Sequence, residues 1–297
     1  MAERQTRAIE LPATWPVPSA AVGVADDQGI CSTAGDPERR WRLASVTKLI
    51  TTLAVLVAVE EGSVDLDGPA GPPGATVRHL LAHTAGYPFQ GEAPIARPGT
   101  RRIYSNTGIE VAAAHLAERA GMPFAEYAAE AVLAPLGMDG TTFEDGESEP
   151  AAAGAWAPLA DVLRLGRELL VPTLIDRATL AEATTVQFPG LAGILPGIGR
   201  MDPCDWGLGV EIRDAKVPHW TGTTNSPRTF GHFGGSGTFL WVDPDAGLAC
   251  AALTDREFDD WALHAWPTFS DAVLAEHRAA EGATTPEPAQ PAHITDG

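Results

Sequence analysis

The sequence contains little cysteine and little positive charge. Its three cysteines, Cys31, Cys204 and Cys250, are odd in number and far apart, which fits neither a disulfide framework nor a paired-ligand zinc site. Only 20 Lys and Arg residues stand against 39 Asp and Glu residues, for a net charge of -19. Such a charge opposes binding to nucleic-acid backbones and to anionic membrane surfaces. We therefore expect neither nucleic acid nor a membrane as a partner.

Long apolar runs are also missing. No stretch approaches the roughly 18 consecutive apolar residues of a membrane-spanning helix. Residues 1–15 lack the apolar block of a secretory signal. Hydrophobic residues nevertheless make up 44% of the 297 residues, which suffices for a substantial core. We expect a soluble, cytoplasmic protein with one large domain or two.

A candidate nucleophile precedes the most apolar segment of the chain. Ser45 and Lys48 are three residues apart, and the apolar residues from Val46 to Val57 recur with the period of a buried helix. Side chains at i and i+3 share one helix face. A lysine kept neutral by burial or by nearby positive charge can accept the proton of a serine hydroxyl. The same residues would also fit a helix N-cap beside a surface lysine.

Strand-like segments lie at both ends of the chain. Residues 20–25 and 30–33 predict a hairpin, and four short β-prone runs follow between residues 207 and 253. The intervening pattern is mostly helical, and the residues from Phe258 onward indicate a helix that is interrupted or bent at Pro267. We predict an α/β (α+β) fold, in which helices flank an antiparallel sheet built from the N- and C-terminal segments and a mainly helical region is inserted.

The predicted regions have definite boundaries. They are a short lead (1–19), a sheet region (20–62 and 205–281), a mainly helical region (63–204) and a disordered tail rich in Thr, Pro, Glu and Ala (282–297). Clefts between two such regions commonly hold ligands. We therefore expect the site at their seam.

Two histidines in a predicted short helix over residues 76–86 could suggest a metal site. His79 and His83 are one helical turn apart, but the glutamate of an H-E-x-x-H zinc motif is replaced by Leu80. We expect packed, hydrogen-bonded histidines, with no metal and no cofactor.

Three short motifs occur in an informative order. Ser45-x-x-Lys48 opens a helix, Tyr104-Ser105-Asn106 lies in a turn, and His232-Phe233-Gly234 lies on a late strand. Together they resemble the serine β-lactamase and penicillin-binding-protein superfamily. The nearest branch holds the class C β-lactamases, the related D-Ala-D-Ala carboxypeptidases and esterases. The likeness extends from about residue 20 to residue 275 and includes Val77–Gly86 and Leu133–Met138.

The resemblance implies a role for each matching residue. Ser45 would be the acylated nucleophile and Lys48 its activator. Tyr104 would carry protons between the nucleophile, the leaving group and water. As a base, its phenol would need cations that stabilise the phenolate, because the unperturbed pKa is about 10. Asn106 would orient Lys48 and the substrate oxygen, and the N–H groups of Ser45 and Gly235 would form an oxyanion hole.

The third motif departs from the family pattern. Its strand usually carries Lys or His, then a hydroxyl residue, then Gly; here Phe233 stands between His232 and Gly234. An aromatic ring cannot donate to a substrate carboxylate, so we expect esters or amides with an apolar acyl group rather than efficient β-lactam turnover. His232 would be cationic part of the time, near its unperturbed pKa of about 6.5. The short N-terminal lead also implies that the helix that usually starts this fold is short or absent, so that the C-terminal helix would cover its face of the sheet alone.

We therefore expect a serine hydrolase that cleaves a small-molecule ester or amide through an acyl-enzyme. One alternative is an acyltransferase or amide synthase that uses the same nucleophile. Others are a β-lactamase or D-Ala-D-Ala carboxypeptidase on the same fold, and an inactive ligand-binding homologue. An α/β-hydrolase is excluded because no serine stands in a G-x-S-x-G motif.

Overall fold

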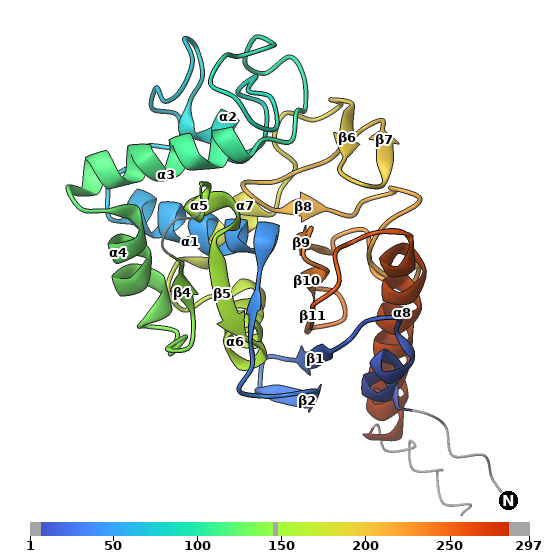
Figure 1. Ribbon diagram of the computed structural model, residues 1–297. Coiled ribbons are helices and arrows are strands. Elements are labelled where there is room, and N and C mark those ends of the chain that lie inside the picture. The colour runs from blue at the N-terminus through green and yellow to red at the C-terminus, as the bar shows by residue number, and fades with distance from the viewer. Residues whose placement is uncertain (1–6, 145–147, 285–297) are drawn as a thin grey trace, which may run out of the picture.

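The computed structural model describes residues 7–144 and 148–284. A six-stranded antiparallel sheet, in the order β2-β1-β11-β10-β9-β8, forms its centre (Figure 1). The strands are β1 (Ala20–Ala25), β2 (Ile30–Ala34), β8 (Glu211–Ile212), β9 (Phe230–Gly234), β10 (Thr238–Asp243) and β11 (Leu248–Thr254). The sheet thus combines the two ends of the chain. The predicted fold class, an antiparallel sheet with flanking helices and a helical insertion, is confirmed.

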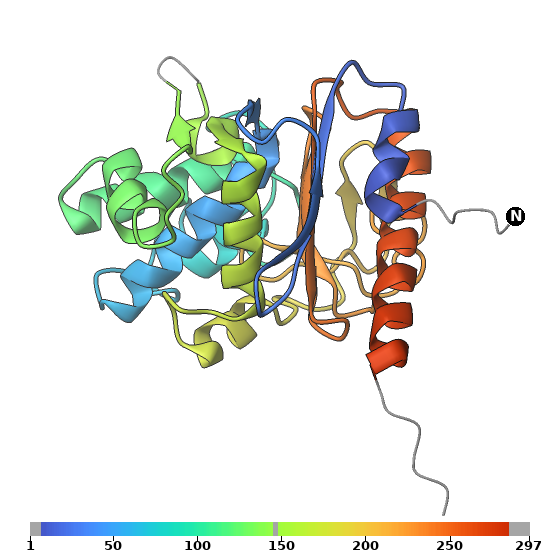
Figure 2. The same ribbon diagram turned by 90° about the horizontal axis from the view of Figure 1, so that it is seen from below.

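The central strands are buried on both faces. Strand β1 pairs with β11 in the register Ala20↔Thr254 to Ala25↔Ala249, and every residue of β10 and β11 is buried. Their sequences are accordingly near-continuous apolar runs rather than alternating ones. Helices therefore cover both sides of the sheet, as Figure 2 shows.

One face packs against α8 (Asp260–Thr284) and the short 3₁₀ helix η1 (Ala8–Thr14). The ring of Trp15, just after η1, meets Phe269 edge-on at 5.5 Å. The N-terminal helix is thus short, as one of the two expectations had it, but the expectation that the C-terminal helix covers this face alone was wrong, because seven residues of 3₁₀ helix followed by a tryptophan share it. Helix α8 continues through Pro267 without ending.

The other face packs against α6 (Leu159–Leu170), with α1 (Thr47–Glu60) beyond it (Figure 2). Glycines allow this close approach. A Cβ on Gly23 of β1 would lie 2.6 Å from Cδ1 of Leu163, and one on Gly166 of α6 would lie 2.9 Å from Cβ of Ala249. Helix and sheet therefore meet at distances that only glycine permits at these two positions.

The inserted region holds the remaining helices. They are α2 (Val77–Leu81), α3 (Asn106–Ala120), α4 (Phe124–Ala128) with a π turn (Ala129–Leu133), α5 (Pro150–Ala153) and α7 (Arg177–Ala183). Two small sheets accompany them: β3 (Arg40–Arg42), β5 (Ala155–Pro158) and β4 (Thr142–Phe143), and the hairpin of β6 (Gly193–Leu195) and β7 (Gly199–Met201).

The helix predicted over residues 76–86 is shorter than expected. It begins after Thr76, whose side chain accepts the N–H of His79, and it ends at Leu81. His83 then adopts a positive φ of 56°, which a helix cannot continue through. At the other end of the chain, α8 includes residues 282–284 of the predicted tail, and residues 285–297 lie outside the described part. No helix within that part is long and apolar enough to cross a membrane.

Candidate active site

Ser45 lies where the chain turns from β3 into α1. It belongs to a 3₁₀ turn, η2 (Ala44–Val46), and α1 begins at Thr47. Ala44 is held at φ 45°, a left-handed conformation that costs a non-glycine residue about 1–2 kcal/mol. Strand β9 passes against this turn, since a Cβ on Gly234 would lie 2.3 Å from the carbonyl oxygen of Leu43. Close backbone contact therefore fixes Ser45 beside β9.

Lys48 is fully buried under Ser45. Its Nζ lies 3.0 Å from Oγ of Ser45, 2.7 Å from Oδ1 of Asn106 and 2.9 Å from the carbonyl oxygen of Ala152. Burial lowers the pKa of Lys48 to about 7, although nearby carboxylates oppose the shift. The amine is therefore neutral in a large fraction of molecules near neutral pH.

The partners of Lys48 determine where its lone pair points. Asn106 Oδ1 and the Ala152 carbonyl can only accept hydrogen bonds. In the neutral amine the two N–H bonds serve these acceptors, which leaves the nitrogen lone pair for the hydroxyl of Ser45. This is the geometry of a general base next to a nucleophile.

Tyr104 contacts the nucleophile from the opposite side. Its Oη lies 2.7 Å from Oγ of Ser45 and 3.4 Å from Nε2 of His232. Burial raises the pKa of Tyr104, so the phenol keeps its proton at neutral pH. Nζ of Lys48 lies 4.9 Å from the ring centroid of Tyr104. Tyr104 is thus placed to donate a proton rather than to act as a phenolate.

His232 is neutral in this setting. Its Nδ1 donates to the carbonyl of Phe233 at 2.7 Å, which leaves Nε2 as an acceptor facing Tyr104. Burial, together with the charge of Lys48, lowers the pKa of His232 to about 3. The partial positive charge expected from its unperturbed pKa is absent here. Phe233 packs against Phe258, with ring centroids 4.6 Å apart, and offers no hydroxyl to the site.

Asn106 connects Lys48 to a carboxylate. It is the first residue of α3, which is capped by the Ser105 hydroxyl accepting the N–H of Gly108. Its Oδ1 accepts from Lys48, and its Nδ2 donates to Oε2 of Glu149 at 2.8 Å. An amine on one side and a carboxylate on the other fix the orientation of the amide.

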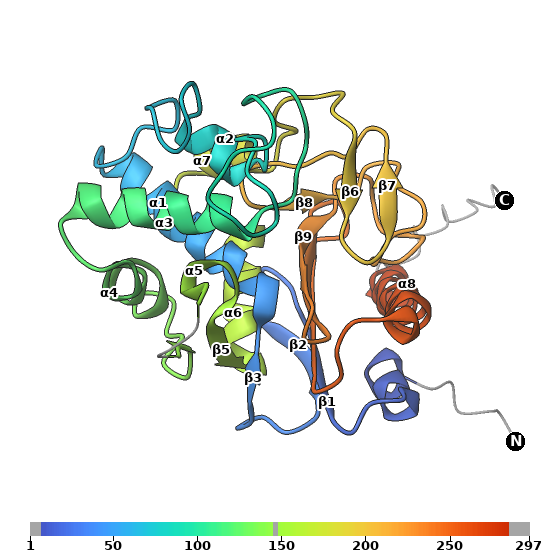
Figure 3. The same cartoon turned by 45° about the horizontal axis from the view of Figure 1, so that its top comes forward.

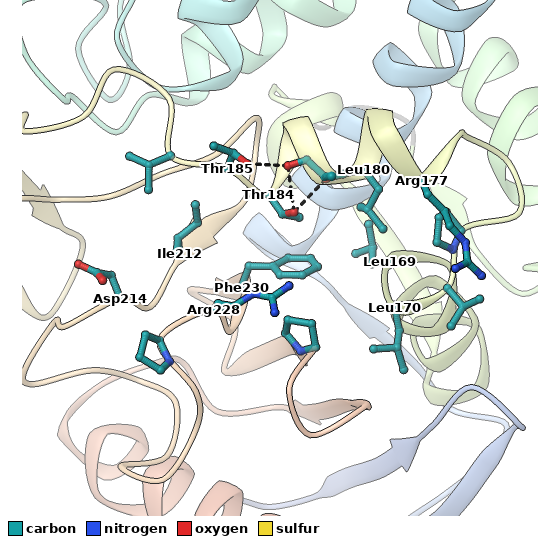
Figure 4. A pocket seen from close by; sticks show the side chains of 16 residues that line it. Leu169, Leu170, Arg177, Leu180, Thr184, Thr185, Ile212, Asp214, Arg228 and Phe230 are labelled. Carbon is teal, nitrogen blue, oxygen red and sulfur yellow. Dashed lines mark hydrogen bonds between the residues drawn. The ribbon is translucent and has the colours of Figure 1, made fainter.

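A small cavity of about 170 Å³ opens onto Ser45. Tyr104, His232 and Gly235 border it, and the rest of its wall is mainly apolar, from Phe89, Leu195, Pro196, Trp206, Phe233 and Phe258. A groove of about 890 Å³ adjoins it and shares Phe89, Tyr104 and Pro196. It lies between the 88–104 segment and the β6–β7 hairpin (Figure 3). A separate hollow beside α6 and α7 contains Leu180 and Phe230 and shares no residue with the Ser45 cavity (Figure 4).

The sequence-predicted residues thus meet at one place, but several neighbours carry no sequence signal. No recognisable sequence spacing relates Ser45 to Glu149, Ala152 or Glu110. Glu110 accepts the N–H of Ala152 at 2.7 Å. Glu211 of β8 lines the same cavity and is buried in an ion pair with Lys216. Only tertiary packing brings these groups to the site.

The two histidines of the 76–83 segment have separate positions. His79 Nδ1 pairs with the hydroxyl of Thr76 at 2.8 Å, and its ring packs on Phe188. His83 is buried, accepts the N–H of Ser105 at 3.2 Å, and places its ring 4.7 Å from that of Tyr104. Both are packed and hydrogen-bonded, and His83 supports the turn that carries Tyr104.

Comparison with known proteins adds independent information. A family model described as Beta-lactamase matches residues 8–273. The crystal structure of a beta-lactamase from Mycobacterium bovis is 54% identical, with a TM-score of 0.89 over 91% of this chain and 99% of that one. Esterase EstB from Burkholderia gladioli is 24% identical, with 86% of each chain covered. The D-alanyl-D-alanine-carboxypeptidase/endopeptidase AmpH of Escherichia coli is 28% identical over 139 residues, so the match spans only about a third of its length.

Proposed function

The chain belongs to the beta-lactamase family, and on this premise we propose that it cleaves an ester or amide through an acyl-enzyme on Ser45. The observation that carries the proposal is the position of Ser45 Oγ, 3.0 Å from Nζ of Lys48 and 2.7 Å from Oη of Tyr104. A nucleophile between a neutral amine and a protonated phenol has both a proton acceptor and a proton donor within reach.

In the acylation step, Ser45 Oγ bonds to the substrate carbonyl carbon while its proton passes to Nζ of Lys48. The tetrahedral intermediate then breaks its bond to the leaving group. That group takes the Tyr104 proton, and Lys48 returns a proton to the phenol. The N–H groups of Ser45 and Gly235 are the proposed donors to the oxyanion, where one such donor typically contributes about 3–4 kcal/mol.

In the deacylation step, water attacks the acyl carbon and gives a proton to Lys48. The Ser45 oxygen leaves and takes that proton back, which restores the starting enzyme. Nε2 of neutral His232 lies 3.4 Å from the phenol oxygen and is an alternative acceptor for its proton once Ser45 no longer accepts it. Asn106 holds the amine of Lys48 in line with the nucleophile.

We infer a preference for esters or amides with apolar groups. Phe233, Phe258 and Trp206 line the cavity where a carboxylate-binding hydroxyl would be needed for a β-lactam or a D-Ala terminus. β-Lactam hydrolysis is the second candidate, supported by the 54% identical relative described as a beta-lactamase. A β-lactam is a cyclic amide that the same acylation would open.

The test is covalent labelling of the whole protein with a fluorophosphonate, read by intact mass. We expect one adduct in the wild type and none in Ser45→Ala. An adduct that persists in Ser45→Ala, or none in the wild type, would refute the proposal. A panel of p-nitrophenyl esters, nitrocefin and D-Ala-D-Ala peptides then decides between the candidates, and a preference for nitrocefin would favour the second.

A further inference from the structure

The groove next to the Ser45 cavity combines apolar surface with positive charge. Among the described residues, five large hydrophobic side chains are strongly exposed, and three of them, Phe89, Ile95 and Ile194, line this groove. Ile95 and Ile194 are 63% and 67% exposed. Apolar side chains gathered on one hollow surface are typical of a ligand-binding groove.

The charges of the groove are opposite to those of the whole chain. Three arginines, Arg101, Arg102 and Arg200, line it, and no Asp or Glu does. The chain as a whole has almost twice as many acidic as basic residues. A local excess of cations in an acidic protein therefore distinguishes this groove from the rest of the surface.

Arg102 is a buried cation without a carboxylate partner among the described residues. It is 3% exposed, and its guanidinium donates to the backbone carbonyls of Ala82, Cys204, Gln187 and Phe188. Burial lowers its pKa to about 10, against weaker longer-range interactions with Cys204 and Asp205, so it stays charged at neutral pH. Carbonyl dipoles solvate the guanidinium but do not cancel its charge.

Arg101 and Arg200 lie exposed at the groove. Arg200 pairs with Asp202 at 2.9 Å, whereas Arg101 makes no ion pair or hydrogen bond through its side chain within the described residues. Arg101 is three residues from Tyr104 in the chain, and both line the groove. It is thus a cation available to a ligand that also reaches the catalytic cavity.

We propose that this groove binds the part of the substrate beyond the scissile bond, and that this part is an apolar chain bearing an anionic group that pairs with Arg101. The inference rests on the proposed function, since it names the substrate class of the same site. Phe89, Tyr104 and Pro196 line both the groove and the Ser45 cavity, so the two spaces adjoin each other. The apolar chain packs on Phe89, Ile95 and Ile194.

The second hollow of the molecule provides a control. It also contains arginines, Arg177 and Arg228, beside apolar residues (Figure 4), but Asp214 lines it as well and Ser45 is not part of it. Arg228 pairs with Asp245 at 2.8 Å. Arg177→Gln removes the same charge from the protein as Arg101→Gln, at a site unconnected to the nucleophile.

The experiment is calorimetric titration of the whole protein with decanoate, with decanol as the uncharged probe of the same length. We expect decanoate to bind the wild type more tightly than decanol. Arg101→Gln should weaken the affinity for decanoate by about fivefold or more and leave the affinity for decanol unchanged. Arg177→Gln should change neither affinity, and Ile95→Ser should weaken the binding of both probes.

Several results would overturn the inference. They are the absence of decanoate binding, equal affinity for both probes, an Arg101→Gln affinity within twofold of the wild type, or a loss caused by Arg177→Gln. The binding assay does not depend on turnover and is repeated in Ser45→Ala. Fluorophosphonate labelling without decanoate binding would refute this inference alone, whereas decanoate binding without labelling would refute the hydrolase proposal and leave a groove that binds an anionic apolar ligand.

Discussion

Nδ2 of Asn106 donates a 2.8 Å hydrogen bond to Oε2 of Glu149, and the same amide accepts from Lys48. One residue, Asn106, therefore lies between the carboxylate and the amine of Lys48, and the negative charge raises the pKa of Lys48 against the larger effect of burial. Glu149 thus orients the Asn106 amide and favours the protonated form of Lys48.

Glu149→Gln tests this relationship. The glutamine oxygen can still accept from Asn106, but the negative charge is lost, so the pKa of Lys48 falls. Because the base must be neutral, the acid limb of the kcat/KM profile for p-nitrophenyl acetate should move to lower pH. Glu144→Gln is the control, since Glu144 pairs with exposed Arg40. An acid limb that stays in place in Glu149→Gln would contradict the assignment.

Lys48→Met tests the cost of burying the amine. The pKa of Lys48 in the folded protein, about 7, lies below the ordinary lysine value of 10.5. Between these values the unfolded chain binds the proton and the folded protein does not, so the free energy of unfolding of the wild type rises with pH across this window. Methionine binds no proton, so the unfolding free energy of Lys48→Met lacks this contribution to the pH dependence.

The wild type should therefore gain stability relative to Lys48→Met, by a few kcal/mol at most, as pH rises from about 7 to about 10. Urea unfolding of both proteins at several pH values measures the difference. If the difference in unfolding free energy between the two proteins does not vary with pH, folding does not lower the pKa of Lys48. The same variant should also fail to acylate.

Tyr104→Phe removes the proton donor but keeps the ring. Ser45 retains its contact with Lys48, so fluorophosphonate labelling should remain detectable while turnover of an ester falls by roughly 10²–10⁴. Because the pKa of Tyr104 is raised, the wild type should show no loss of rate from phenol ionisation at mildly alkaline pH. An unchanged turnover number in the variant would remove Tyr104 from the mechanism.

Two adjacent glycines give a matched pair of substitutions. A Cβ on Gly234 would lie 2.3 Å from the Leu43 carbonyl oxygen, whereas a Cβ on Gly235 would meet nothing within 4 Å. Gly234→Ala should push β9 away from the Ser45 turn and lower stability by about 1–3 kcal/mol. Gly235→Ala should leave Tm unchanged. Thermal unfolding of both variants makes the comparison, and equal Tm values would argue against the close contact.

The sequence predicted the parts of the fold that local patterns encode. Helix α1 has a clear helical period, and the β1–β2 hairpin and the late strands are short β-prone runs separated by turn residues. The motifs at Ser45, Tyr104 and His232, separated by 59 and 128 positions, meet as expected at the seam. No comparable signal marks Glu149 or the groove arginines, since contacts between segments far apart in the chain place them.

Local pattern also failed where backbone conformation depends on tertiary contacts. The helix of residues 76–86 has a continuous helical sequence pattern, yet it ends at Leu81 because His83 turns back to support Ser105. Likewise, the unperturbed pKa of His232 could not reveal its burial beside Lys48.

The pairing of β1 with β11 has a consequence for biosynthesis. Some 230 residues separate the two strands in the chain, and β1 has no inner neighbour until β11 has been made. On the ribosome, Ser45 and Lys48 therefore emerge long before β9 can wall them in. The pocket around Ser45 is therefore incomplete until β9, β10 and β11 have been made, and its assembly waits for these late strands.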